Sequence, residues 1–426
     1  MKKLSRRDII HAGLAGTGAL AAPAIITRYA WAQTGPIKIG MLEAQSGANK
    51  YVSEARIAAT QFAADRVNAL GGLLGRKVEI VAVDSEFKPD VAARRANELL
   101  LGEKVDVLIA YGGGVAKVAA QIANKADKIF VSTSTLPAEL TGADFMPTTF
   151  SLAFNSEMIS RGVATYIAGS NIKKVFILCQ DYASGRSAGE TFKKRFDALK
   201  KVDQALVGEE YHPTFKLTDF APYITKVMAS GADALMTANF GPDLRLLIQQ
   251  GAQLGWNIKV VGFYLNDPTL AIAVGDALVG HVTVGVNQIT LDTPTQRKFL
   301  TEWRPRFKDA PHFYRLPDLA TGQALNGAVW LLEVIRKAGS VETAALIKAW
   351  EGDKYEALWG PAELRSCDHQ IISPCGVAEI LPAAKIPEEI RFYGMEFPYI
   401  GPATAIPASA LATPLSETGN KRCLAT

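Results

Sequence analysis

The chain has 426 residues, of which 48% are hydrophobic and 21% charged, a composition that is typical of a folded globular protein and excludes a disordered one. The first 32 residues carry five basic residues and one acid, which is the whole net charge of +4, so the remainder is neutral. These charges are Lys2, Lys3, Arg6, Arg7, Arg28 and Asp8. A neutral remainder excludes nucleic acid and an acidic membrane surface as electrostatic partners.

The N-terminal segment has the pattern of an export signal over residues 1–32. A basic start is followed by an apolar run over residues 9–26, and Ala30-Trp31-Ala32 is a small-x-small cleavage site that leaves Gln33 as the new N-terminus. Residues 5–10, SRRDII, resemble the twin-arginine signal, with the general secretion route as the alternative. A membrane anchor is disfavoured because three glycines and Pro23 interrupt the apolar run. We therefore expect an extracytoplasmic protein in the periplasm.

Residues 36–150 alternate between strand and helix patterns. Strands are expected at PIKIGML, KVEIVAVD, VDVLIAY and KIFVSTST. Helices are expected at SEARIAATQFAADRVNALGG, from Pro89 through ARRANELLLGE, and at GGGVAKVAAQIANKA. Such alternation predicts a parallel sheet with helices on both faces.

The pattern restarts over residues 156–282, which predicts a second doubly wound unit. The expected strands are KVFILC, ADALMTAN and KVVGFY, each preceded or followed by a helical pattern. About 390 residues are too long for one ordinary core, in agreement with two domains. After this unit come helices without strands between them, then a strand pair, PAELRSC and CGVAEIL. Residues 401–426 are rich in Pro, Ala, Thr and Ser and are expected to form a loosely ordered tail.

Several stretches in order along the chain resemble the periplasmic solute-binding proteins of ABC importers, in particular the leucine-type branched-chain amino acid binding group. They are IKIGMLEAQSG, NALGGLLGRKVEIVAVDSEFKPDVAARRANELL, LPAELTG, QDYASGRSAGETFKKRF, ANFGPDLRLLIQQGAQLG and RSCDHQ. The resemblance implies the α/β type I periplasmic binding protein fold, two doubly wound parallel-sheet lobes joined by a multi-crossover hinge. On this basis the N-terminal lobe comprises 36–150 plus about 286–358, and the C-terminal lobe 153–283 plus about 360–400. The implied partners are a small solute and an ABC permease in the inner membrane, with the twin-arginine machinery for export.

The ligand cleft of such a protein is expected where loops follow the strands, since ligands of open parallel sheets meet the carboxyl ends of strands. In the first unit these loops contain Gly113 and Gly114, whose backbone can approach an acceptor closely, and Ser134 and Thr135, whose hydroxyls can contact a polar ligand. The alternatives are a tight strand-to-helix turn and a helix cap.

In the second unit the same reasoning selects aromatic and amide side chains. Tyr182, Asn239, Phe240, Tyr264 and Asn266 follow three of its strands, and aromatic rings offer large contact areas. Core packing is the alternative for Phe240. The family usually has an aromatic residue immediately before Gly185, where this chain has Ser184.

Two departures from the family bear on the solute. Glycines and Leu136 stand where amino acid binders carry hydroxyl side chains for the α-carboxylate, and the only acid near Tyr264 that could meet an α-ammonium is Asp267. Leucine-like solutes are thus possible but not favoured, and an aromatic or other organic acid is preferred, with short amides as a further class.

The cysteines suggest one bond. Cys367 and Cys375 flank a short turn and are predicted to form a disulfide in an oxidising compartment, the alternative being two free thiols. Cys179 is expected to be a buried thiol, and Cys423 lies in the expected tail.

No pattern for catalysis, cofactor or metal is found. The five histidines have no partner at metal-ligand spacing, and no G-x-S-x-G, Walker loop or G-x-G-x-x-G follows a predicted strand where it would be needed. An exported enzyme is therefore the least favoured alternative. A ligand-sensing receptor of the same fold is the other alternative, and the lack of a second apolar segment after residue 33 disfavours it.

Overall fold

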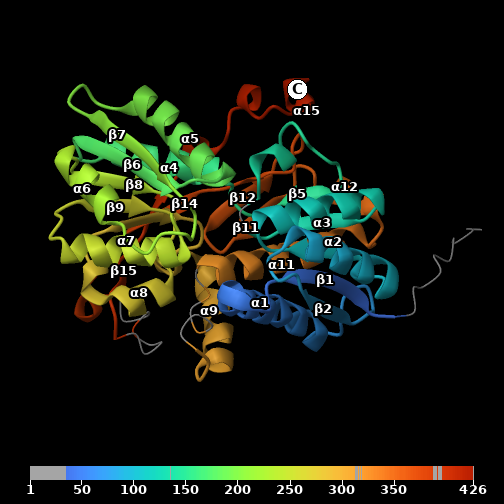
Figure 1. The fold of residues 1–426 in the computed structure, drawn as a ribbon. Coiled ribbons are helices and arrows are strands. Elements are labelled where there is room, and N and C mark those ends of the chain that lie inside the picture. Colours follow the sequence, from blue (N-terminus) through green and yellow to red (C-terminus); the bar gives the residue numbers. More distant parts are fainter. Residues whose placement is uncertain are drawn as a thin grey trace, which may run out of the picture. The chain divides into compact units, whose positions relative to one another are not determined.

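A computed structural model describes residues 35–134, 136–311, 315, 317, 319–386, 391 and 396–425 (Figure 1). The predicted export signal over residues 1–32 and the predicted site residue Thr135 lie outside the described residues. Among the helices that are described, none is long and apolar enough to cross a membrane.

The first sheet is entirely parallel, with strand order β2-β1-β3-β4-β5. Its strands are β1 Ile37–Glu43, β2 Val78–Asp84, β3 Val107–Ala110, β4 Ile129–Ser132 and β5 Thr149–Ser151. The helical segments between them are η1 Gly47–Asn49, α1 Lys50–Ala69, α2 Pro89–Asn97, η2 Glu98–Gly102, α3 Gly113–Lys125 and η3 Ala138–Leu140. Strands β3 and β4 are fully buried, as expected of a parallel sheet covered on both faces.

The second sheet is parallel in its centre and antiparallel at one edge, with order β15-β14-β10-β9-β8-β6-β7 and β16 also paired to β14. Its strands are β6 Lys174–Gln180, β7 Ala205–His212, β8 Ala234–Thr237, β9 Lys259–Gly262, β10 Val282–Gly285, β14 Cys375–Leu381, β15 Tyr399–Ile400 and β16 Thr404–Ile406. Its helical segments are α4 Ser156–Gly169, α5 Ala183–Leu199, α6 Ala221–Ala229, α7 Gly241–Gln253, α8 Pro268–Val274 and η4 Gly275–Leu278.

The chain returns to the first sheet after β10. The segments involved are η5 Ile289–Leu291, α9 Pro294–Phe307, α11 Leu319–Ala338, α12 Thr343–Trp350, β11 Lys354–Ala357, β12 Gly360–Leu364 and β13 Ile371–Ile372. Helix α11 packs against α1, and the side chain of Trp303 on α9 lies 5.0 Å from the ring of Phe62 on α1. We call the first sheet with α1–α3, α9, α11, α12 and β11–β13 the first lobe, and the second sheet with α4–α8 the second lobe.

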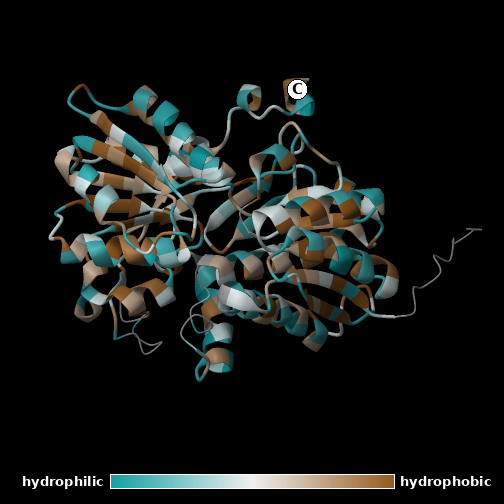
Figure 2. Ribbon diagram, viewed as in Figure 1, coloured by the Kyte–Doolittle hydropathy of each residue, from teal (hydrophilic) through white to brown (hydrophobic). Residues whose placement is uncertain are grey.

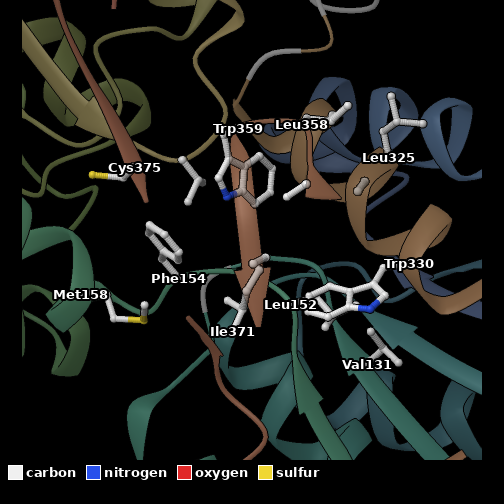
Figure 3. Close-up of a cluster of buried hydrophobic side chains, with 14 of the residues drawn as sticks. Val131, Leu152, Phe154, Met158, Leu325, Trp330, Leu358, Trp359, Ile371 and Cys375 are labelled. Atoms are coloured by element: carbon white, nitrogen blue, oxygen red, sulfur yellow. The ribbon is translucent and has the colours of Figure 1, made fainter. Parts of the chain in front are cut away.

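The chain thus crosses between the lobes at residues 152–155, 286–293 and 373–374, which confirms the predicted fold of two wound sheets joined by several crossovers. Figure 3 shows Leu152 and Phe154 of the first crossing in one buried cluster with Trp359, Ile371 and Cys375, which come from the segments on either side of the third crossing. The predicted lobe boundary near residue 359 stays a prediction, and the antiparallel pairing of β11 with β12 favours 373–374 instead.

The hydropathy of the chain follows these layers. Figure 2 shows apolar residues concentrated in the strands and on the helix faces that meet them. Ile37, Ile39 and Met41 on β1 have no exposed surface, and neither have Ile109 and Val131 on the neighbouring strands. Burial of such side chains stabilises the fold by about 1.5–3 kcal/mol each.

The predicted disulfide between Cys367 and Cys375 is wrong. Cys367 is bonded to Cys423, 56 residues away, and Cys375 is a buried free thiol. The physical reason is that the two predicted strands do not form a hairpin, since β12 pairs with β11 and β13 whereas β14 joins β10 in the second sheet. Cys375 therefore lies on the second sheet, whereas Cys367 lies in the turn between β12 and β13.

The predicted loose tail is also corrected. Over residues 401–425 the chain forms β16 and then α14 Ala408–Leu411, η7 Leu415–Glu417 and α15 Lys421–Leu424. Leu411 and Cys423 are buried, which a solvated tail would not allow. The low-complexity composition predicted mobility, but the disulfide and the strand pairing with β14 hold the segment in place.

Candidate functional site

A cavity of about 1210 Å³ is lined by residues of both lobes. Its walls come from loops at the carboxyl ends of strands, with Gly112, Gly113 and Ser134 in the first lobe and Tyr182, Phe240 and Tyr264 in the second. Helix N-termini point to this edge of a parallel sheet, so backbone N–H groups are available there. The cavity is large enough for a small organic molecule.

The N-terminus of α3 forms part of the first-lobe wall. Gly112 adopts a φ of 93°, and a Cβ at this position would lie 2.4 Å from the ring of Phe87, so only glycine fits. Helix α3 then begins at Gly113, and both Gly113 and Gly114 line the cavity. The first N–H groups of a helix have no partner within it and carry partial positive charge, so this wall suits an anion.

The loop after β4 is held by a buried ion pair. Arg56 on α1 lies 3.1 Å from both carboxylate oxygens of Glu43, and both residues are fully buried. The same guanidinium donates to the backbone oxygen and the hydroxyl of Thr133, both at 2.9 Å. Burial raises the pKa of Glu43, while the charge of Arg56 opposes that rise. The buried guanidinium of Arg56 therefore fixes the loop that carries Ser134.

Ser134 presents an unpaired hydroxyl at the cavity. It is 5% exposed, lines the cavity, and its Oγ has no hydrogen-bond partner among the described residues. Its backbone oxygen accepts from Ser132 Oγ at 2.8 Å, which fixes the residue without engaging its side chain. A buried hydroxyl without a partner costs free energy unless a ligand or water completes it.

The second-lobe wall is an aromatic cluster around Phe240. The Phe240 ring centroid lies 5.1 Å from that of Phe215, 5.9 Å from that of Tyr264 and 6.3 Å from that of Tyr182, with the rings edge to face. All four line the cavity. Tyr182 precedes α5 and Phe240 precedes α7, so the ends of β6 and β8 place their rings. This arrangement is suited to contact with a flat apolar ring.

Two predicted site residues are turned away from the cavity. Asn239 is fully buried, and its Nδ2 lies 2.8 Å from His212 Nε2 inside the second lobe. Asn266 is 1% exposed; its Oδ1 accepts from Thr283 Oγ1, and its backbone oxygen accepts from Tyr399 Oη at 2.6 Å. Neither is among the residues that line the cavity.

Asp267 makes a contact between the lobes. Its Oδ1 accepts from the backbone N and the hydroxyl of Thr269 and so caps α8, while its Oδ2 accepts from the hydroxyl of Tyr51 on α1 at 3.1 Å. Burial raises the pKa of Asp267, and burial together with the nearby Asp267 charge raises that of Tyr51. The carboxylate is therefore already engaged by the protein.

The sequence-based prediction missed four aromatic residues that line the cavity: Tyr51, Phe87, Tyr111 and Phe215. Tyr51 and Phe87 follow β1 and β2, and Phe215 follows β7. The rule that ligands meet the carboxyl ends of strands applies to these loops as well and could have found them. Tyr111 immediately precedes the glycines that were selected, and Arg56 lies 4.9 Å from its ring.

Among the described residues, one cluster of side chains has the spacing of metal ligands. Cys367, Asp368 and Cys423 come close enough to share an ion, but the two sulfurs are joined in the disulfide. A bonded sulfur is not a thiolate ligand. Of the histidines, His212 and His369 are fully buried and hydrogen-bonded within the protein, and His11 and His312 lie outside the described residues.

Comparisons with known proteins agree with this architecture. A family model described as "periplasmic binding protein" matches residues 36–385. The Leu/Ile/Val-binding protein homolog 4 of Brucella melitensis is 24% identical over 379 residues, which are 86% of this chain and 89% of that protein.

Two solved structures share the fold at low identity. One is a solute-binding protein of an ABC transporter from Rhodopseudomonas palustris in complex with 3,4-dihydroxybenzoic acid, with a TM-score of 0.75, 22% identity and coverage of 88% of this chain and 98% of that one. The other is a leucine-, isoleucine-, valine-, threonine- and alanine-binding protein from Brucella ovis, with a TM-score of 0.77, 20% identity and coverage of 89% and 97%.

Proposed function

Because the chain belongs to the periplasmic binding protein family, we propose that the cavity between its lobes binds a small aromatic carboxylate. The protein is a periplasmic substrate-binding component of an ABC importer and not an enzyme, as its sequence predicted. It binds a small organic solute and hands it to a membrane permease. Export through the twin-arginine machinery is part of the proposal and rests on residues 5–10.

The proposed class of solute rests on one observation: hydrogen-bond donors of the first lobe lie across the cavity from a cluster of aromatic rings in the second lobe. The unpaired Ser134 hydroxyl and the start of α3 at Gly113 offer hydrogen bonds to a carboxylate. Across the cavity the rings around Phe240 offer a surface to an aromatic group. Arg245, a further cavity residue, has no acidic partner among the described residues and adds positive charge.

An amino acid would need an acceptor for its ammonium group, and the acids of the cavity are already engaged. Asp267 accepts from Tyr51 and Thr269, Asp368 pairs with Arg365, and Glu417 pairs with Arg161. Glu139 pairs with Lys117, and Glu157 accepts from Ser187. The structure from R. palustris is in complex with 3,4-dihydroxybenzoic acid, and the protein from B. ovis is named for binding leucine, isoleucine, valine, threonine and alanine, so the experiment must separate aromatic acids from amino acids.

The test is a thermal-shift screen of the mature protein, followed by calorimetric titration. The solutes are benzoate, benzamide, cyclohexanecarboxylate, leucine and phenylalanine. Comparison among them separates the effects of the carboxylate, the aromatic ring and the ammonium group. A ligand at 100 times its Kd stabilises the folded state by about 2.7 kcal/mol, which a melting curve detects. We expect benzoates to raise the melting temperature most. Equal effects of benzamide and benzoate, or a preference for leucine, would contradict the proposal, and turnover of any solute would favour an enzyme instead.

A further inference from the structure

The C-terminal segment of the chain lies beyond the part that the family model matches, which ends at residue 385. We call residues 408–425 the strap. The strap begins on the second lobe, where β16 pairs with β14 and α14 packs against α4. There Leu411 is fully buried, and a methyl group added at Gly162 of α4 would lie 3.0 Å from Leu411 Cδ2.

An ion-pair cluster fixes the middle of the strap to the second lobe. Glu417 Oε2 lies 2.6 Å from a guanidinium nitrogen of Arg161 on α4 and 3.0 Å from the ammonium of Lys194 on α5. The hydrogen bond from Lys194 and the charge of both cations lower the pKa of Glu417. Arg161 is itself 7% exposed, so this is more than a surface contact.

A few residues later the strap is attached to the first lobe. Asn420 donates to the backbone oxygens of Thr141 at 3.0 Å and Cys367 at 3.1 Å. Arg422 pairs with Glu351 at 2.7 Å, and Cys423 forms the disulfide with Cys367. The backbone passes so close that a Cβ on Gly142 would lie 2.4 Å from the backbone oxygen of Thr418.

The strap is therefore bound to both lobes within a few residues, and the disulfide makes this attachment covalent. It also forms part of the cavity wall, through Thr413, Glu417 and Thr418. In Figure 1 the strap, with α15, lies at the top, whereas α1 and α8, which carry the Tyr51–Asp267 contact, lie in the lower part of the view. The lobes are thus joined at one side of the cavity by a disulfide and at the other by a hydrogen bond between side chains.

We propose that the strap is a fourth connection between the lobes, which restrains their separation on its own side of the cavity. The solute then enters and leaves on the side of Tyr51 and Asp267. Lobes joined by short crossovers move as hinged bodies, and an additional covalent tie between them restricts that motion. The proposal does not depend on the identity of the solute.

The test measures lobe separation in the mature, solute-free protein by electron–electron double resonance. Spin labels are attached to a ketone amino acid, so the native cysteines are untouched. One pair replaces the exposed residues Asp144 and Glu190 near the strap, and the other replaces the exposed residues Lys50 and Ile272 near the Tyr51–Asp267 contact. We expect a narrow distance distribution for the first pair and a broader one for the second.

Three variants decide the matter. Cys423→Ser removes the covalent tie, Glu417→Ala removes the ion pairs without touching the disulfide, and Cys375→Ala changes a buried cysteine outside the strap. We expect the first two to broaden the Asp144–Glu190 distribution and the third to leave it unchanged. If Cys423→Ser fails to fold, Glu417→Ala carries the test alone. A distribution that stays narrow in the folded strap variants, or that is already as broad as the other pair in the native protein, would overturn the proposal.

Discussion

The two walls of the cavity are built in different ways. The first-lobe wall places the backbone N–H groups at the start of α3 and the Ser134 hydroxyl beside the rings of Tyr51, Phe87 and Tyr111. The buried Arg56–Glu43 ion pair holds the loop of Ser134 in position. The second-lobe wall consists of rings that touch one another, with Phe240 at their centre. The first wall thus combines directed hydrogen-bond donors with aromatic rings, whereas the second wall offers mainly aromatic contact area.

The difference between the walls shows that hydrogen-bond donors and aromatic rings need different degrees of fixation by the surrounding protein. Hydrogen-bond donors must be fixed in position before the ligand arrives, because their strength falls steeply with poor geometry. Rings tolerate small shifts, since contact with an aromatic surface is less directional. Substitutions in the Arg56–Glu43 pair should therefore lower the unfolding free energy and disorder the loop of Ser134. Substitutions in the rings around Phe240 should instead weaken the affinity for the solute.

The largest effect is expected for Arg56→Met. The change leaves the Glu43 carboxylate buried without its charged partner, and loss of one member of a buried pair costs about 3–5 kcal/mol of unfolding free energy. Urea unfolding measures this loss. As a control, Arg297→Met removes an exposed pair with Asp292 and should cost less than about 1 kcal/mol.

The pH dependence of the unfolding free energy provides a second test of Arg56→Met. Burial already raises the pKa of Glu43, and loss of the Arg56 charge raises it further, so the folded variant takes up a proton at higher pH than the unfolded chain does. The deficit of Arg56→Met relative to the native protein should therefore shrink as the pH falls toward the unfolded-state value. A deficit that is constant from pH 8 to pH 5 would show that Glu43 is not the source of the loss.

A smaller effect, on affinity, is expected in the aromatic wall. Phe240→Ala removes the ring that three others contact, and we expect the Kd of the solute found in the screen to rise roughly 10- to 100-fold, or about 1.4–3 kcal/mol. Phe240→Leu keeps apolar volume without the ring and should lose less. Calorimetric titration measures both, and an unchanged Kd in the alanine variant would remove the aromatic wall from the binding site.

The next effect concerns the hydroxyl of the first wall. Ser134→Ala should raise the Kd of a carboxylate solute by about 5- to 10-fold, as expected for the loss of one hydrogen bond of about 1–1.4 kcal/mol. The unfolding free energy should stay nearly unchanged because the Oγ has no partner in the described protein. Ser132→Ala is the matched control, since its Oγ supports the Ser134 backbone and its loss should lower stability as well. Equal affinity in Ser134→Ala would contradict a carboxylate at this position.

Both walls could be located from the sequence, because the alternation of strands and helices fixes which loops share an edge. The individual side chains could be predicted less well. Asn239 and Phe240 are neighbours in the chain, yet Phe240 lines the cavity and Asn239 faces His212. The direction of a side chain at the end of a strand depends on the dihedral angles of one or two residues, which a sequence pattern does not specify.

The strap was beyond prediction for a different reason. Its composition resembles that of a solvated tail, and the contacts that order it come from residues far away in sequence, such as Arg161, 256 positions before Glu417. Spacing in the sequence favours Cys375 as the partner of Cys367, but the actual partner, Cys423, is 56 residues away. Local patterns carry information on local structure, and these contacts are not local.

The smallest effect is expected at the contact that joins the two walls, between Tyr51 and Asp267. The Tyr51 hydroxyl donates to the ionised carboxyl group and so favours its charged form. Tyr51→Phe removes this donor and keeps the ring, and the pKa of Asp267, which burial already raises, should rise further. Carbon-13 chemical shifts of labelled aspartate carboxyl groups, followed from pH 3 to pH 8, measure this change.

Tyr166→Phe, on α4, serves as the control for that titration because Tyr166 has no contact with Asp267 among the interactions of the described residues. Since Asp267 keeps its hydrogen bonds from Thr269, the unfolding free energy of Tyr51→Phe should fall by no more than about 1 kcal/mol. A pKa of Asp267 that is unchanged in Tyr51→Phe would mean that the two residues do not meet in solution. The strap and the three crossovers would then be the connections between the lobes that remain in the solute-free protein.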